Sequence, residues 1–303
     1  MPALKSGKSY TATATLNPSL KTDHYPLRAR LELNGTITTQ TENFQIVPRP
    51  LPFSMPVIMW GSSPDDTAQL KDIGFTHCLG LRADVGSVWE AKKPVPPGKP
   101  ELIESNRRML DQALADGINV VASLSPANMF EHDDKMARVD RSGKPYTRRD
   151  ICASMPELPP FFENVGRSVA QTYGDMPALS AALIDTEVRD ASQPSFNAVD
   201  VENYRKFANA DIPAEVVTRG GVDYTKLKDF PQDRVIADDH PILKYYRWFW
   251  TTGDGWNALH SALSRGVKGG SNRLWTWFDP AVRQPSISGA GGSVDVLSHW
   301  TYT

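Results

Sequence analysis

Three ionisable side chains, Asp185, Glu187 and Arg189, stand two residues apart directly after the apolar run 181–184. An apolar run of strand length that ends abruptly in charged residues is typical of a buried parallel strand whose C-terminal end opens into a site. Side chains two residues apart leave an extended strand on the same face. The sequence therefore predicts that two carboxylates and a guanidinium converge on one point, where they could perform general acid and base chemistry.

Polar and aromatic residues also stand where the other expected strands end. In βα architectures the loops at the C-terminal ends of the strands meet over the sheet, so these residues are expected to share one site. Indole rings stack on the apolar faces of sugar rings, while carboxylates and arginines bind sugar hydroxyls. The corresponding prediction is a carbohydrate site, with substrate bound by Trp60, Arg82, Asp84, Arg189 and Trp277.

The elements that position these residues alternate between strand and helix from residue 55 onward. Strands are expected at 56–61, 76–82, 118–124, 181–187 and 273–279, with a brief one at 233–237. Helices are expected at 63–74, 102–116, 156–173, 200–209 and 239–263, the last with room for a kink at Gly253 and Gly255. This order predicts an α/β protein with a parallel sheet covered by helices. We expect a (β/α)8 TIM-type barrel, and an incomplete one because closure needs eight strands.

Residues 8–47 have a different pattern. Alternating, threonine-rich segments predict strands at 9–16, 27–33 and 36–47, and Asn34-Gly35 predicts a hairpin turn between the last two. We therefore expect a β-rich accessory module over residues 1–50, which would be the end of a β-sandwich. A proline-rich linker at 48–52 separates it from the barrel catalytic domain expected over 51–303.

Composition narrows the class of protein. The 303 residues are 40% hydrophobic and carry a formal net charge of −2, which suits a globular protein with a large core. Without a lysine or arginine run, nucleic acid and anionic membranes are not expected partners, and no segment reaches the roughly 20 apolar residues that cross a bilayer. Residues 1–9 lack a signal-peptide core, so we expect a secreted or periplasmic protein if a signal peptide precedes this chain, and a cytoplasmic one otherwise.

With these features the chain resembles the (β/α)8 glycoside hydrolases of the β-galactosidase-like clan, in which a β-sandwich often precedes the barrel. In that clan an acid/base glutamate, usually preceded by asparagine, ends the fourth strand; the motif Asp185-Thr186-Glu187 puts Glu187 there, with Thr186 at the asparagine position. The clan's nucleophile is a glutamate ending the seventh strand. No late glutamate matches it, so Asp279 is the nearest substitute, unless the nucleophile lies beyond Thr303.

The resemblance implies a glycosidase that cleaves an oligo- or polysaccharide by carboxylate acid/base catalysis, without cofactor. Glu187 would donate the proton, with a pKa raised by burial and by Asp185 and opposed by Arg189. The two carboxyl groups would lie about 5 Å apart for retention and up to about 9.5 Å apart for inversion. The alternative is a non-catalytic carbohydrate-binding barrel or an inactive fragment. The sequence leaves the oligomeric state open.

Structural roles remain open for the same residues. Asp185 and Glu187 could cap a helix or pair with Arg189, and Trp275 and Trp277 could simply fill the barrel core.

Other polar residues also have two interpretations. Arg82 and Asp84 could pair with each other, and the acidic turn 131–134 could hold a cation or be solvated. A metallohydrolase would need a histidine cluster at the strand ends, and no histidine or cysteine spacing resembles a metal site, so no metal is expected. Cys78 and Cys152 lack disulfide-framework spacing, so we expect free thiols.

Overall fold

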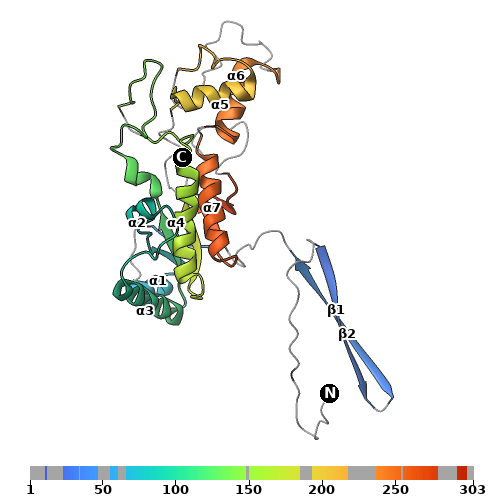
Figure 1. Ribbon diagram of the computed structural model, residues 1–303. Helices are drawn as coiled ribbons and strands as arrows, with labels where there is room; N and C mark the ends of the chain where they lie inside the picture. Colours follow the sequence, from blue (N-terminus) through green and yellow to red (C-terminus); the bar gives the residue numbers. More distant parts are fainter. Residues whose placement is uncertain are drawn as a thin grey trace. The chain divides into compact units, whose positions relative to one another are not determined.

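The computed structural model describes residues 11, 23–33, 35–46, 55–60, 66–147, 150–184, 193–217, 237–253, 255–278 and 292–298 (Figure 1). The chain divides into two compact units, Met1–Pro50 and Leu51–Thr303. Among the described residues, no helix is both long and apolar enough to cross a membrane.

The first unit contains an antiparallel hairpin of β1 (Asp23–Leu33) and β2 (Thr36–Ile46). Gly35 has a φ of 76°, the left-handed conformation that a tight hairpin turn requires. The hairpin expected from Asn34-Gly35 is therefore confirmed, with its first strand starting four residues earlier than the expected residue 27. Of the expected strand 9–16, only Thr11 is among the described residues, and it is not in a strand. The sandwich remains a prediction.

The second unit is built on a six-stranded parallel sheet whose strands lie side by side in chain order. They are β3 (Ile58–Met59), β4 (His77–Gly80), β5 (Asn119–Leu124), β6 (Leu179–Ile184), β7 (Trp275–Phe278) and β8 (Val296–Leu297). Doubly wound sheets reverse their strand order at a switch point, whereas (β/α)8 barrels keep it. The order in this sheet is the barrel order.

Two aromatic contacts show that the sheet is curled. The ring centroids of His77 on β4 and Trp275 on β7 lie 6.0 Å apart, and those of Trp60, next after β3, and Trp277 on β7 lie 6.2 Å apart. In a flat sheet β3 and β7 would be separated by four strand spacings, or about 19 Å. The rings meet because the sheet bends toward the face that carries them. The predicted α/β fold with an incomplete TIM-type barrel is thus confirmed.

The sheet has a different core on each face. Its concave face is filled by Val121, Ala181, Leu183, Trp275 and Trp277, with Ile58, Leu79 and Val296 packed against them. The other face packs on the helices, which are α1 (Thr67–Asp72), α2 (Val85–Ala91), α3 (Pro100–Asp116), α4 (Leu158–Tyr173) and α7 (Asn257–Gly270), and on the 3-10 helix η2 (Pro126–Phe130). A third apolar cluster joins α5 (Ala198–Ala208) to α6 (Pro241–Thr251).

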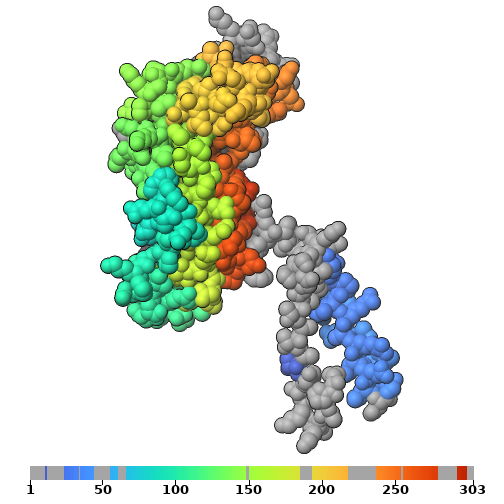
Figure 2. Space-filling view, viewed as in Figure 1, coloured from blue at the N-terminus to red at the C-terminus, as the bar shows by residue number. Residues whose placement is uncertain are grey.

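Helices α4 and α7 lie against each other, yellow-green beside orange-red in the space-filling view (Figure 2). Glycines allow this close approach. A Cβ at Gly166 would collide with the backbone oxygen of Leu263, and one at Gly266 with that of Glu163. The sequence pattern indicated both helices, but only their packing explains these two glycines.

The helix expected over 239–263 is wrong as one element, because the structure has two helices there. Helix α6 ends at Thr251 and α7 starts at Asn257. Gly253 donates its backbone N–H to the Trp248 carbonyl at 2.7 Å, where a side chain would strike the Trp248 ring. Trp256 then takes a positive φ of 73°. The glycines mark a break and not a kink, since close backbone turns replace the helical hydrogen bonds.

The other expected helices and the main strands are present, but their ends differ from the expected residues. The five main strands are confirmed, mostly shorter than expected, and residues 185–187 and 279 lie outside the described residues. Residues 233–236, which form most of the brief expected strand, also lie outside the described residues. Helix α2, η2 and the two-residue strand β8 were not expected, because such short segments carry too little periodicity.

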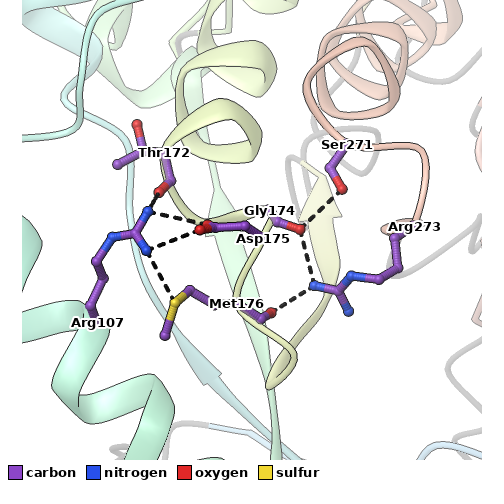
Figure 3. Close-up of polar contacts among 7 residues, drawn as sticks. All are labelled: Arg107, Thr172, Gly174, Asp175, Met176, Ser271 and Arg273. Atoms are coloured by element: carbon purple, nitrogen blue, oxygen red, sulfur yellow. Dashed lines mark hydrogen bonds and ion pairs between the residues drawn. The ribbon is translucent and has the colours of Figure 1, made fainter.

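The turn between α4 and β6 is held by two arginines (Figure 3). Arg107 on α3 contacts both carboxylate oxygens of Asp175 at 3.1 Å and lowers the pKa of that carboxyl by hydrogen bonding. Arg273, two residues before β7, donates to the carbonyls of Gly174, Met176 and Pro177 at 3.2, 2.6 and 3.3 Å. These contacts join three βα units at the start of their strands.

Replacing Arg273 with methionine is expected to lower the free energy of unfolding by about 2 kcal/mol, because three carbonyls lose a charged donor. Urea denaturation would measure this. Arg108→Met is the matched control, since Arg108 lies on exposed α3 surface and its ion pair among the described residues is with Glu104 at 3.6 Å. Its expected loss is below about 0.5 kcal/mol. Equal losses in the two variants would show that the Arg273 contacts contribute nothing specific.

Candidate active site

The structure brings together two of the predicted site residues, Trp60 and Trp277. Their rings meet edge to face at an interplanar angle of 86°. Trp277 is 7% exposed, and its indole N–H donates to the Ser298 hydroxyl at 2.8 Å, which fixes the ring. Trp60 is 50% exposed. The result is one anchored indole that supports a second, solvent-facing indole at the strand ends.

Below this pair, the barrel interior is structural. His77, the first residue of β4, is buried against Trp275, and its Nδ1 lies 2.7 Å from the Thr76 hydroxyl. Burial lowers the pKa of His77 to about 4, so the ring is neutral at neutral pH. Trp275 is 5% exposed within the same cluster. For Trp275, the core interpretation is the right one.

The carboxylate motif follows the expected strand. β6 is the fourth strand of the parallel sheet, and its last residue, Ile184, is fully buried. Asp185, Glu187 and Arg189 come directly after it and lie outside the described residues.

The late aspartate also follows a sheet strand. Asp279 comes directly after β7, which is the fifth strand and lies beside β6, and it too lies outside the described residues. The catalytic roles of all these residues remain predictions.

Arg82 and Asp84 line a different feature of the fold. At the end of β4, Leu81 takes a positive φ of 35° and packs its side chain among the helix-side core residues, although Leu79 faces the barrel interior. Asp84 begins α2, where its carboxylate accepts from the backbone N–H and the hydroxyl of Ser87 at 3.0 and 2.8 Å. Within the described part of the chain, Arg82 makes no ion pair with Asp84.

An open hollow of about 450 Å³ adjoins these two residues, and neither tryptophan lines it. Its walls are Leu81, Arg82, Ala83, Asp84, Pro97, Gly98, Leu102 and Asn106. Of the predicted site residues that the structure describes, Trp60 and Trp277 meet at the strand ends, whereas Arg82 and Asp84 line this separate hollow beside α3.

The loop after β5 contains a buried charged cluster that the sequence pattern did not indicate. The Arg138 side chain is fully buried, and its Nε lies 2.9 Å from a carboxylate oxygen of Asp150. Asp200 on α5 is also fully buried and accepts from the Cys152 thiol at 2.9 Å. Burial raises the pKa of both carboxyls, and Arg138 opposes the rise in each. No sequence signal marks this cluster, because charged residues in a polar loop are ordinarily solvated.

The same loop holds the segment that follows the carboxylate motif. Arg138 donates to the Gln193 carbonyl at 2.8 Å, and Tyr146 donates its hydroxyl to the Pro194 carbonyl at 2.8 Å. Phe196 N–H donates to the Val139 carbonyl at 2.9 Å. The described residues on either side of 185–192 are therefore held in place, by β6 before the stretch and by these contacts at residues 193–196 after it.

Among the described residues, no group of three or more histidine, cysteine, aspartate or glutamate side chains is placed to hold an ion. In the acidic turn 131–134, Asp133 accepts from the Lys135 backbone N–H at 2.9 Å, an ordinary turn contact. Cys78 and Cys152 are buried thiols that form no disulfide with a described residue, and burial raises the pKa of the Cys78 thiol to about 11.

Solved structures similar to this chain include glycoside hydrolases. A β-galactosidase from the Antarctic haloarchaeon Halorubrum lacusprofundi is 14% identical at a TM-score of 0.46, over 74% of this chain and 35% of its own. A β-galactosidase from the psychrophilic Marinomonas ef1 is 15% identical at a TM-score of 0.45, over 71% of this chain and 34% of its own. A family 39 glycoside hydrolase from the gut symbiont Bacteroides cellulosilyticus WH2 is 14% identical at a TM-score of 0.33, over 85% of this chain and 39% of its own.

This chain spans about a third of the length of the β-galactosidases it matches. No protein-family model and no curated protein matches the sequence. The structural neighbours are of the class that the sequence resembles.

Proposed function

We propose that this chain carries the substrate site and the general acid of a glycosidase that cleaves an oligo- or polysaccharide. The observation that carries the proposal is the Trp60–Trp277 pair at the strand ends of a curled parallel sheet. A half-exposed indole offers an apolar face on which a sugar ring can stack. Trp277 lies on β7, next to the strand that leads into Glu187.

Glu187 is the proposed proton donor to the leaving oxygen. It follows the fourth strand after a fully buried isoleucine, and a buried carboxyl with a second acid nearby keeps its proton at higher pH. Asp185 is that second acid in the proposal. Arg189 would bind sugar hydroxyls and favour the ionised form of its neighbours. Asp279, after the adjacent strand, is the candidate second catalytic carboxylate.

The direct test is the release of reducing sugar by the purified chain from a panel of plant and algal oligosaccharides. Release is the expected result, and the substrates cleaved would define the class of sugar. Binding of a sugar without release, by a protein with a cooperative thermal melt, would contradict the proposal and favour the non-catalytic carbohydrate-binding alternative.

Trp60→Ala is expected to raise KM, or to weaken sugar affinity, by about tenfold. Removing the indole face costs about 1–2 kcal/mol of apolar burial on binding. The matched control is Phe207→Ala, because Phe207 is a similarly exposed aromatic residue, at 48%, on α5. Kinetics or titration with the best substrate would measure both variants. Equal affinity in Trp60→Ala and the parent chain would remove Trp60 from the site.

A further inference from the structure

We propose that the hollow between the end of β4 and the start of α3 is a second ligand site, for a sugar that carries a carboxylate, such as a uronic acid. Its volume of about 450 Å³ falls in the usual range for small-molecule sites. The walls are mostly apolar, with a few polar groups, as is usual for such sites. The polar groups are Arg82, Asp84 and Asn106.

The charged side chains of the hollow favour a ligand that carries a carboxylate. Asp84 is committed to Ser87, which donates both its backbone N–H and its hydroxyl to the two carboxylate oxygens. Arg82 is exposed and makes no ion pair with a described residue. A guanidinium binds a carboxylate through two parallel hydrogen bonds, a geometry that lysine cannot match. Asp84 keeps its negative charge in its hydrogen bonds with Ser87, so Arg82 is the group through which this hollow would bind an anionic ligand.

The remaining walls suit a sugar ring. Ala83, Pro97 and Leu102 offer apolar surface to the C–H face of a pyranose. Asn106, whose amide N–H₂ donates to the Tyr173 hydroxyl at 2.9 Å, also lines the hollow. A ligand with both a carboxylate and a ring of hydroxyls fits these walls better than a bare anion.

Two unusual backbone positions shape the hollow. The positive φ of Leu81 turns its side chain into the helix-side core, so the chain leaves β4 with Arg82 at the surface. Gly98 has a φ of 139°, and a Cβ there would lie 2.7 Å from Leu102 Cδ2. Conformations of this kind are costly for most residues and gather at binding sites.

The carboxylate part of this inference stands on the hollow alone, whereas the sugar part rests on the proposed glycosidase function. The probes are therefore D-glucuronate, D-glucose and acetate, titrated into the full chain and followed by calorimetry or by NMR of the ligand. We expect glucuronate to bind at least tenfold more tightly than either glucose or acetate. Acetate binding as tightly as glucuronate would overturn the sugar part, and no glucuronate binding would overturn the site.

Substitutions of residues that line the hollow test whether the ligand binds there. Arg82→Gln and Leu102→Glu are expected to weaken glucuronate binding at least tenfold, the first by removing the guanidinium and the second by adding a negative charge to the wall. Arg108→Gln, on the exposed surface of α3, is the control and should bind as the parent does. Unchanged binding in Arg82→Gln would overturn the proposal, and thermal melts would establish that each variant is folded.

The second site and the proposed glycosidase function can fail separately. Trp60→Ala should leave glucuronate binding unchanged, because Trp60 does not line the hollow. If Trp60→Ala abolishes binding and Arg82→Gln does not, the ligand sits on the tryptophan pair and the second site is wrong. A chain that releases no reducing sugar but binds glucuronate through Arg82 would overturn the glycosidase proposal and support the carboxylate site.

Discussion

Glu187→Gln is expected to lower turnover on natural oligosaccharides by about 10²–10⁴-fold while changing KM little. A positioned general acid contributes about that factor, and glutamine has nearly the shape of glutamate but no proton to give. The matched control is Glu215→Gln, at an exposed glutamate in the segment after α5. Its turnover should equal that of the parent.

Two further readouts separate a general acid from a structural glutamate. Aryl glycosides whose leaving group is already a weak base need no proton, so Glu187→Gln should lose much less rate on them. The fall in turnover at high pH, which reports loss of the acid's proton, should disappear in the variant. A variant that keeps full turnover on natural substrates, or loses equally on both substrate types, would rule out Glu187 as the acid.

Arg138→Met is expected to lower the free energy of unfolding by about 3–5 kcal/mol at neutral pH. Removing one partner of a buried ion pair leaves an uncompensated charge, and Arg138 is the cation beside Asp150 and opposes the raised pKa of Asp200. Its hydrogen bond to the Gln193 carbonyl is lost as well. Urea denaturation would measure the change.

The loss of stability in Arg138→Met should depend on pH. Burial already raises the pKa of Asp150 in the folded state, and removing Arg138 raises it further. The folded state then holds a proton that the unfolded state releases above a pH of about 4, so stability falls as pH rises from there through the folded-state pKa. Arg138→Met should be nearer to the parent at a pH of about 4 than at pH values near 8.

A double variant tests the cause. Adding Asp150→Asn to Arg138→Met should recover part of the lost stability, because the carboxylate left without its cation is then neutral. If the double variant is as unstable as the sum of the two single changes, the pair is not coupled and the predicted mechanism is wrong.

The sequence by itself determined the local elements and the class of fold. Hydrophobic periodicity and capping residues placed β5, β6, β7 and α4 to within a few residues, and Asn34-Gly35 placed the hairpin turn. These signals are local because they arise from backbone geometry within one element. The position of Glu187 after the fourth strand followed from counting such elements.

Only the tertiary structure decided which strand-end residues meet. Trp60 and Trp277 are 217 positions apart in the chain (277 − 60) and touch because the sheet curls, whereas the positive φ of Leu81 takes Arg82 and Asp84 into a separate hollow. Arg138, in the loop after β5, is fully buried beside Asp150. Sheet curvature and loop burial depend on contacts between distant segments, and no local pattern in the sequence records them.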